Sequence, residues 1–282
     1  MSRNCAKAIL VSIALVAHTG AAWGADYLVA DHEQGLRGSH GSPLSGRIEF
    51  RVGSTEYEID NPLLGPPVEA DATTWSVRGT VNASGGAANA QLDGFFGTAS
   101  SFGVEEETYR GTLHGYYRPK GGMYAAGVYA TLASLPVGLE DAEEIGGGVE
   151  AAILLGRTTL AGRLGYSSLT VDFSEDDAEL YSGQIGARFY ATDNLRLDLT
   201  GMVNRLEGEG VQFDNYALEA AAHWRPGGRF YSLNTGVRLD HDDASGVSAT
   251  TLFGGAKLHF GSSSLIDEDR SGALWHHMSR TP

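Results

Sequence analysis

Histidine and serine are the residue types in this sequence that could carry out acyl transfer. A hydrolase needs a hydroxyl nucleophile, a histidine base and an orienting acid or amide. His114, His223 and His259, together with many serines, could supply such a set. However, the sequence contains no Gly-x-Ser-x-Gly nucleophile elbow, and no particular combination is favoured. We therefore expect that the protein is not an enzyme, and the sequence predicts no catalytic residues.

Metal binding is the second chemistry that the residue types allow. Residues 240–243 read Asp-His-Asp-Asp, but an exposed acidic loop is the simpler interpretation of this run. The single cysteine, Cys5, excludes a cysteine-based zinc site and a disulfide framework. No metal ligands and no cofactor are predicted. Weak binding of Ca²⁺ or Mg²⁺ by acidic loops is the one exception, because these cations prefer carboxylate oxygens.

Composition limits the classes of partner and of fold. The chain has 282 residues, with 20 Lys and Arg against 35 Asp and Glu, and a formal net charge of −15. This acidic balance disfavours nucleic-acid binding, which needs clustered basic residues to neutralise phosphates. A hydrophobic content of 42% argues against general disorder.

The first residues follow the pattern of a secretory signal peptide. Arg3 and Lys7 precede a short apolar run at residues 8–17, and Ala22-Trp23-Gly24 provides small residues before a cleavage site. The apolar run is too short to span a bilayer as a helix. The sequence therefore predicts a signal peptide at residues 1–24, whose removal would also remove Cys5, and a periplasmic N-terminal segment at residues 25–45.

Alternation of apolar and polar residues with period two covers most of the remaining chain. Residues 180–190, 194–204 and 229–240 are clear examples. A soluble β-sandwich would also alternate, so the period alone does not identify a membrane protein. The length of the segments distinguishes a membrane barrel from a soluble sandwich, because about ten residues match a tilted membrane strand and exceed the usual length of a strand in a soluble protein.

The connections alternate between short and long. Tight turns are predicted at residues 119–122, 156–157, 192–194 and 226–228, and longer acidic loops at residues 100–107, 133–144, 168–179, 205–215 and 240–248. This layout predicts an all-β fold, a transmembrane antiparallel up-and-down β-barrel at residues 46–260, with a periplasmic tail at residues 261–282. Twelve strands are expected if residues 47–57 form the first strand with a bulge at Gly53, and ten is the alternative count.

Three short motifs carry a family resemblance. They are Thr192-Asp193-Asn194-Leu195-Arg196-Leu197, Gln91-Leu92-Asp93-Gly94, and the final strand at residues 252–260 followed by Ser264-Leu265-Ile266. The chain resembles the porin-like outer-membrane β-barrel proteins of Gram-negative bacteria, in particular a group of small barrels with a short charged tail after the last strand. The resemblance implies insertion into the outer membrane by the barrel-assembly machinery, with Leu258 and Phe260 similar to its recognition signal.

Charges on the polar phase of the strands are the candidate functional residues. This phase contains nine bases and five acids, which would face the lumen. They could pair with one another inside a narrow barrel, or line a water-filled path that favours anions, and both can hold at different depths. The candidates for lumen contacts and selectivity are Arg78, Arg110, Glu150, Arg163, Arg188, Arg196, Asp198, Glu219, Arg238 and Lys257.

The five longer loops carry the opposite charge, since they contain 18 acids and Arg205 as their one base. From this distribution we expect an outer-membrane porin-like channel for passive diffusion of small, anionic solutes. A closed barrel that serves as an envelope scaffold or adhesin is the alternative, and an outer-membrane hydrolase is less favoured. The expected partners are outer-membrane lipid and lipopolysaccharide, the barrel-assembly machinery and small solutes, with no nucleic acid.

Overall fold

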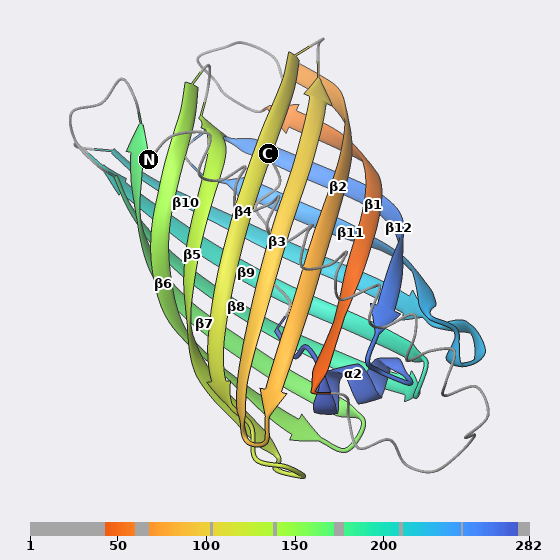
Figure 1. Ribbon diagram of the computed structural model, residues 1–282. Coiled ribbons are helices and arrows are strands. Elements are labelled where there is room, and N and C mark those ends of the chain that lie inside the picture. Colours follow the sequence, from red (N-terminus) through yellow and green to blue (C-terminus); the bar gives the residue numbers. More distant parts are fainter. Residues whose placement is uncertain are drawn as a thin grey trace.

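Twelve antiparallel strands form one closed barrel in the computed structural model (Figure 1). The structure describes residues 43–59, 68–101, 104–137, 140–171, 178–208, 211–243 and 245–275. The strands are β1 Leu44–Ile59, β2 Val68–Gly85, β3 Ala88–Ser101, β4 Val104–Tyr117, β5 Tyr124–Val137, β6 Glu140–Leu155, β7 Thr158–Val171, β8 Ala178–Thr192, β9 Leu195–Gly208, β10 Val211–Trp224, β11 Tyr231–Asp242 and β12 Val247–Phe260. The predicted signal peptide and most of the predicted N-terminal segment lie outside the described residues.

Each strand pairs with its neighbours in the chain, and β1 closes the barrel by pairing with β12. In that closing pair Gly46 lies opposite Phe260, and Ile59 lies opposite Val247. Closure satisfies the backbone donors and acceptors of every edge, which is the requirement for strands within a membrane. The prediction of an up-and-down barrel is confirmed, and so is the count of twelve strands rather than ten.

The two faces of the wall differ as the alternating sequence predicts. Along β1, Phe50 and Val52 point outward and are 54% and 57% exposed, whereas Arg47 and Glu49, on the alternate phase of the same strand, are buried inside. Large apolar side chains such as Leu113, Val128 and Ile185 are exposed on other strands in the same way. An apolar exterior around a polar interior is the arrangement of a membrane-spanning barrel. Among the described residues, no helix has the length and hydropathy needed to cross a membrane.

One end of the barrel carries the tight turns. Two-residue connections join β2 to β3 and β6 to β7, and Gly86 and Gly156 in them have φ values of 81° and 51°. Only glycine adopts this region without strain, which explains its place in these hairpins. The turn between β10 and β11 contains a short 3₁₀ helix, η2 (Pro226–Gly228). In outer-membrane barrels this short-turn end faces the periplasm.

The structure corrects the prediction of a bulge at Gly53. Pairing of β1 with β2 and with β12 continues without a register shift through this glycine. An added Cβ would lie 2.9 Å from the Thr74 hydroxyl and 3.1 Å from the Leu252 carbonyl, so glycine here permits close packing. The apolar phase fades after Gly53 because β1 extends past the apolar belt, where neither face needs to be hydrophobic.

The acidic connections are also shorter than the sequence predicted. Strands of 12 to 18 residues exceed the roughly 9–11 that cross a bilayer, and the extra length lies at the end opposite the tight turns. For example, Glu140 pairs with Val137, and Glu144 pairs with Ala133, within the β5–β6 ladder. Much of the acidic sequence therefore lies on strand extensions, because backbone pairing continues after the hydrophobic pattern has ended.

After β12 the chain turns back into the short-turn end of the barrel. The helix α2 (Leu265–Ser271) lies there, at the end of the barrel where β12 finishes (Figure 1). Leu265, Leu274 and Trp275 are buried, as are the carboxylates of Glu268 and Asp269. We call residues 262–275 the plug. The sequence predicts a periplasmic tail at residues 261–282. Residues 262–275 of this tail pack inside the short-turn end of the barrel, and residues 276–282 lie outside the described part.

Candidate functional site

A polar cavity lies in the lumen near the middle of the barrel, and we call it the central cavity. It is lined by Glu49, Arg51, Arg78, Ala161, Gly162, Arg163, Gln184, Gly186, Arg188, Arg196, Asp198, Thr200, Glu219, His223, Lys257 and Trp275. Seven of the ten predicted lumen residues are among them. The lining has six Arg or Lys side chains against three carboxylates, so its fixed charge is positive. Such an excess attracts anions.

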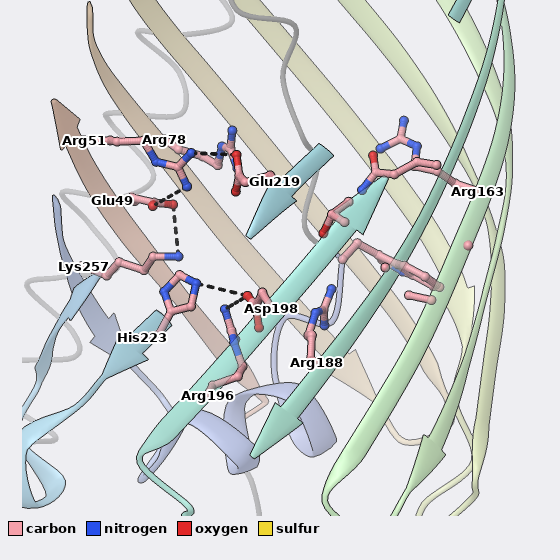
Figure 2. Close-up of a pocket in the computed structure, with 16 residues that line it drawn as sticks. Glu49, Arg51, Arg78, Arg163, Arg188, Arg196, Asp198, Glu219, His223 and Lys257 are labelled. Atoms are coloured by element: carbon pink, nitrogen blue, oxygen red, sulfur yellow. Dashed lines mark hydrogen bonds and ion pairs between the residues drawn. The ribbon is translucent and has the colours of Figure 1, made fainter. Parts of the chain in front are cut away.

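Ion pairs hold the carboxylates of the central cavity against one side of its wall (Figure 2). Glu49 lies 3.3 Å from Arg51 and 3.2 Å from Lys257, and it also accepts a 2.9 Å hydrogen bond from Asn234. Arg51 reaches Glu219 at 3.1 Å as well. These pairs compensate buried charges that would otherwise be costly. Pairing and a basic cavity, the two alternatives left open by the sequence, are thus present in the same lumen.

A second ionic group lies on β9 and β10. Arg196 contacts Asp198 at 2.8 Å, and His223 contacts the same carboxylate at 3.1 Å. The Asp198 Oδ1 and Arg196 Nε atoms have no protein partner among the described residues. Buried polar atoms of this kind normally bind water, and a cavity of about 60 Å³ has room for a few water molecules.

Aromatic rings support two of the arginines that face the central cavity. The Arg163 guanidinium lies 4.0 Å from the centre of the Tyr129 ring, and that of Arg78 lies 5.5 Å from the centre of Phe95. Figure 2 shows Arg163 on the opposite side of the cavity from the Arg51 and Glu49 group. Stacking on an aromatic ring helps to hold a guanidinium in place.

The remaining three predicted lumen residues lie outside the central cavity. Arg110 pairs with Glu144 at 2.9 Å beside a cavity of about 30 Å³. Glu150 contacts the buried His114 at 3.0 Å, and the other ring nitrogen of His114 lies 3.1 Å from Asp93. The structure therefore distributes the predicted residues over several depths of the lumen instead of forming one ring.

Arg238, the third predicted lumen residue outside the central cavity, lines a larger cavity toward the acidic end of the barrel. This outer cavity measures about 220 Å³ and is lined by Thr55, Tyr57, Asn215, Arg238, Asp240, His241, Asp242, Val247, Ala249 and Thr251. Arg238 pairs there with Asp240 at 2.6 Å. The outer cavity thus has a larger volume than the central cavity.

The plug supplies functional side chains that the sequence did not identify. Arg188 of β8 forms an ion pair with Asp269, and the same carboxylate accepts a 2.5 Å hydrogen bond from Thr159. Arg47 donates to Glu268 at 2.5 Å and to the Trp275 carbonyl at 3.1 Å. The signal for this element was present: Ser264 caps α2 by accepting from the Asp267 amide at 3.1 Å, as the Ser-x-x-Asp spacing indicates.

Backbone and apolar contacts complete the plug. Gln91 donates to the Trp275 carbonyl at 2.9 Å and accepts from the Trp275 amide at 3.2 Å. Trp275 also packs edge-on against Tyr116, with ring centres 5.7 Å apart, in a cluster with the fully buried Leu274. Arg118 donates to the carbonyls of Asp269 and Gly272. These contacts tie the plug to several strands around the barrel.

One hydrogen-bonded chain has the connectivity of a catalytic triad. The Ser232 hydroxyl lies 2.8 Å from His259 Nε2, and His259 Nδ1 lies 2.6 Å from Glu268 Oε2. Ser232 is completely buried, and it lines none of the three cavities described above. A nucleophile needs access to its substrate. We therefore assign this chain the structural role of holding the plug.

Electrostatics at the plug favour the ionised carboxylate of Glu268. Burial raises the pKa of this group, but His259 and Arg47 outweigh burial and hold the pKa well below its usual range. Burial also lowers the pKa of Arg225 in the β10–β11 turn, whose guanidinium donates to the Ser262 carbonyl at 2.8 Å. Charged groups thus hold the plug at the middle of α2 and at the segment that precedes it.

The described residues contain no preformed metal site. No three His, Cys, Asp or Glu side chains there are grouped so that they could hold a metal ion. The predicted weak binding of Ca²⁺ or Mg²⁺ concerns acidic connections of which residues 172–177 lie outside the described part. That expectation stays a prediction.

Comparison with known proteins gives the fold. No protein-family model matches the sequence, and no curated protein matches it. Among solved structures, the COG4313 outer membrane channel from Pseudomonas putida F1 is similar with a TM-score of 0.54 and 14% identity, covering 80% of this chain and 99% of that one. The anion-selective porin from Comamonas acidovorans has a TM-score of 0.42 and 12% identity over 77% of this chain and 98% of its own. The first similarity, together with the closed barrel, shows that this chain has the fold of outer-membrane β-barrels.

Proposed function

We propose that the protein is an outer-membrane channel for passive diffusion of small solutes and that it prefers anions. The observation that carries the proposal is the central cavity, where six bases outnumber three carboxylates in the lumen of a membrane-spanning barrel. The similar barrel from Pseudomonas putida is described as an outer membrane channel, which supports transport as the function of this fold. Lipopolysaccharide and the barrel-assembly machinery remain predicted partners.

Anion preference follows from the arrangement of these charges. The carboxylates Glu49 and Asp198 are each shared by two cationic or basic groups, so they present little unneutralised negative charge to the lumen. Arg163 and Arg78 face the same space from aromatic supports. In a narrow pore, fixed cationic charge lowers the barrier for anions and raises it for cations.

A closed barrel that serves as a scaffold is the second candidate, and the filled lumen favours it. The central cavity is only about 60 Å³, and the plug occupies the short-turn end. A conducting state therefore requires movement of the plug or of lumen side chains. The two candidates differ in one property, which is whether the folded barrel passes current.

Single-channel recording in a planar bilayer with a potassium chloride gradient tests the proposal. We expect discrete conductance steps and a reversal potential displaced toward the chloride equilibrium potential. Replacing Arg78 and Arg163 with glutamine should move the reversal potential toward zero, because both guanidinium groups line the central cavity.

The matched control is Arg205→Gln. Arg205 pairs with Asp214 at 2.8 Å on an exposed part of the wall, outside the central cavity, so its loss should leave the reversal potential unchanged. Folded wild-type protein that inserts and passes no current under any voltage would exclude the channel and favour the scaffold.

A further inference from the structure

Arg188 is a wall arginine that belongs both to the central cavity and to the contacts of the plug. Its guanidinium lines the cavity, beside Trp275 of the plug, and it also donates to the Asp269 carboxylate and, at 2.7 Å, to the Leu274 carbonyl of the plug. Arg47, which binds Glu268 of the plug, does not line the cavity. A solute in the cavity can therefore reach Arg188 but not Arg47.

We propose that Arg188 is an oxyanion-binding site of the lumen, which Asp269 occupies while the plug is docked and a small carboxylate or phosphate solute occupies when the plug is released. This inference rests on the proposed channel function and identifies the plug as the gate of the channel. The plug is then an intramolecular competitor of the transported anion.

The surroundings of Asp269 are those of a built oxyanion site. One carboxylate oxygen binds Arg188, and the other accepts from Thr159 at 2.5 Å and from Arg270 at 3.2 Å. Asp269 is 1% exposed. Arg270 belongs to the plug and leaves with it, so Arg188 and the Thr159 hydroxyl are the wall groups that remain for a solute anion. A guanidinium edge and a hydroxyl suit both carboxylates and phosphates, because both anions present oxygen atoms to several donors.

Charge compensation makes exchange between Asp269 and a solute anion feasible. Removing one partner of a buried ion pair is unfavourable because it leaves the other charge uncompensated. An anion that replaces Asp269 keeps Arg188 paired, while the released carboxylate becomes hydrated outside the lumen. The anion shifts the equilibrium toward the open state because it binds Arg188 only after Asp269 has left.

The plug is joined to β12 by a glycine turn. Gly261 has a φ of 71°, and a Cβ at this position would lie 2.3 Å from the Leu44 carbonyl, so only glycine fits at the junction between the strand and the plug. Within α2, Ser264 caps the first turn, and the Ser271 hydroxyl donates to the Asp267 carbonyl at 2.8 Å. Its internal hydrogen bonds do not depend on the barrel.

A reversible crosslink between plug and wall tests whether movement is required. A Cβ built on Gly272 would lie 2.9 Å from the Ser45 hydroxyl, and the one native cysteine is Cys5 in the predicted signal peptide. The double variant Ser45→Cys/Gly272→Cys should therefore form a disulfide that locks the plug. In planar bilayers we expect openings to disappear on oxidation and to return on addition of a thiol reductant, with Ser45→Cys alone unaffected.

The anion site is tested by open probability at constant ionic strength, with inorganic phosphate or acetate replacing part of the chloride. Phosphate, acetate or both should raise the open probability of the wild type. The probe that raises it identifies whether the site binds phosphates, carboxylates or both. Asp269→Asn should raise it about tenfold without either probe, because Arg188 loses its partner in the docked state. Arg188→Gln should abolish the response to both probes.

The control for Asp269→Asn is Asp267→Asn, which removes the same charge from the same helix. Among the described residues, the Asp267 side chain accepts hydrogen bonds from Ser263 and Ser271 of the plug and from no residue of the wall, so the open probability of Asp267→Asn should stay within about twofold of the wild type. If the locked protein conducts normally, or neither probe changes the open probability, the gate is refuted and the channel stands. If no variant conducts although all fold, the channel itself is refuted.

Discussion

Charged side chains in this lumen function in pairs, and the partner decides what each can do. Glu49 is shared by Arg51 and Lys257 and is held on the wall, whereas Arg188 is divided between the central cavity and the plug. A buried charge without a partner is costly, so each pair is also a constraint on structure. Arg188 differs from Arg47, whose partner Glu268 lies on the same helix as Asp269, in that Arg188 also lines the central cavity.

Arg47 provides a test of a structural pair. Arg47→Gln should lower the free energy of unfolding by about 3–5 kcal/mol, because the side chain is buried and its loss leaves Glu268 without a guanidinium partner. Urea unfolding of the protein in lipid vesicles measures this quantity.

The control pair is exposed. Arg157 and Asp193 lie 3.0 Å apart with side chains 53% and 62% exposed, so Arg157→Gln should cost less than about 1 kcal/mol. Equal losses in the two variants would contradict the view that burial makes the Arg47 pair important.

The sequence could predict where charges point but not which of them would pair. Period-two alternation predicts on which face of the wall each candidate residue lies, because the phase of a strand determines the face of each side chain. Seven of the ten candidates line the central cavity. Partners are set by three-dimensional closeness instead. Arg188 meets Asp269 across 81 residues of sequence, and Arg47 meets Glu268 across 221. No local pattern reports contacts at such separations.

At the scale of elements, α2 shows why the packing of residues 262–275 inside the barrel was not predicted. The strands can be recognised and counted in the sequence because the alternation of apolar and polar residues is repeated twelve times. A seven-residue helix offers only a cap and one apolar side, and it gains its stability from packing inside the barrel. The same absence of a repeat led to the predicted bulge at Gly53, where a strand continued after its apolar pattern had ended.

The cap of α2 can be tested by two substitutions at one position. Ser264→Ala should destabilise the helix by about 1 kcal/mol, since the Asp267 amide loses its acceptor, whereas Ser264→Gly should cost only a few tenths. Amide hydrogen exchange of residues 265–271 measures the difference as faster exchange in the alanine variant. Similar exchange in both variants would show that the cap does not determine the stability of the docked helix.

Docking of α2 should also depend on acid pH. The pKa of Glu268 in the folded protein lies below its ordinary value of 4.5, so the ionised group stabilises the docked state. This contribution is complete above about pH 4.5 and is lost as the pH falls through the lower folded value. Hydrogen exchange of residues 265–271 should therefore accelerate on acidification below that point.

Glu268→Gln separates this effect from general acid unfolding. The variant should exchange faster than the wild type at neutral pH and show a smaller acceleration on acidification. An unchanged acid response in the variant would mean that another group is responsible.

At the scale of the whole molecule, charge is sorted by depth. The net charge of −15 conceals acidic strand extensions at one end, a basic central cavity, and a plug whose carboxylates neutralise lumen arginines at the other end. In the proposed channel, an anion entering from the acidic end would meet the larger outer cavity before the basic central cavity. The proposal therefore assigns selectivity to the central cavity and the exit to the plug.

The most direct test of the channel is the reversal potential of the Asp269→Asn variant in a potassium chloride gradient. Release of the plug separates selectivity from gating, so the current reports on the central cavity itself. We predict steady conductance with a reversal potential near that of chloride. A folded variant that passes no current, or one whose reversal potential lies near that of potassium, would contradict an anion-preferring channel.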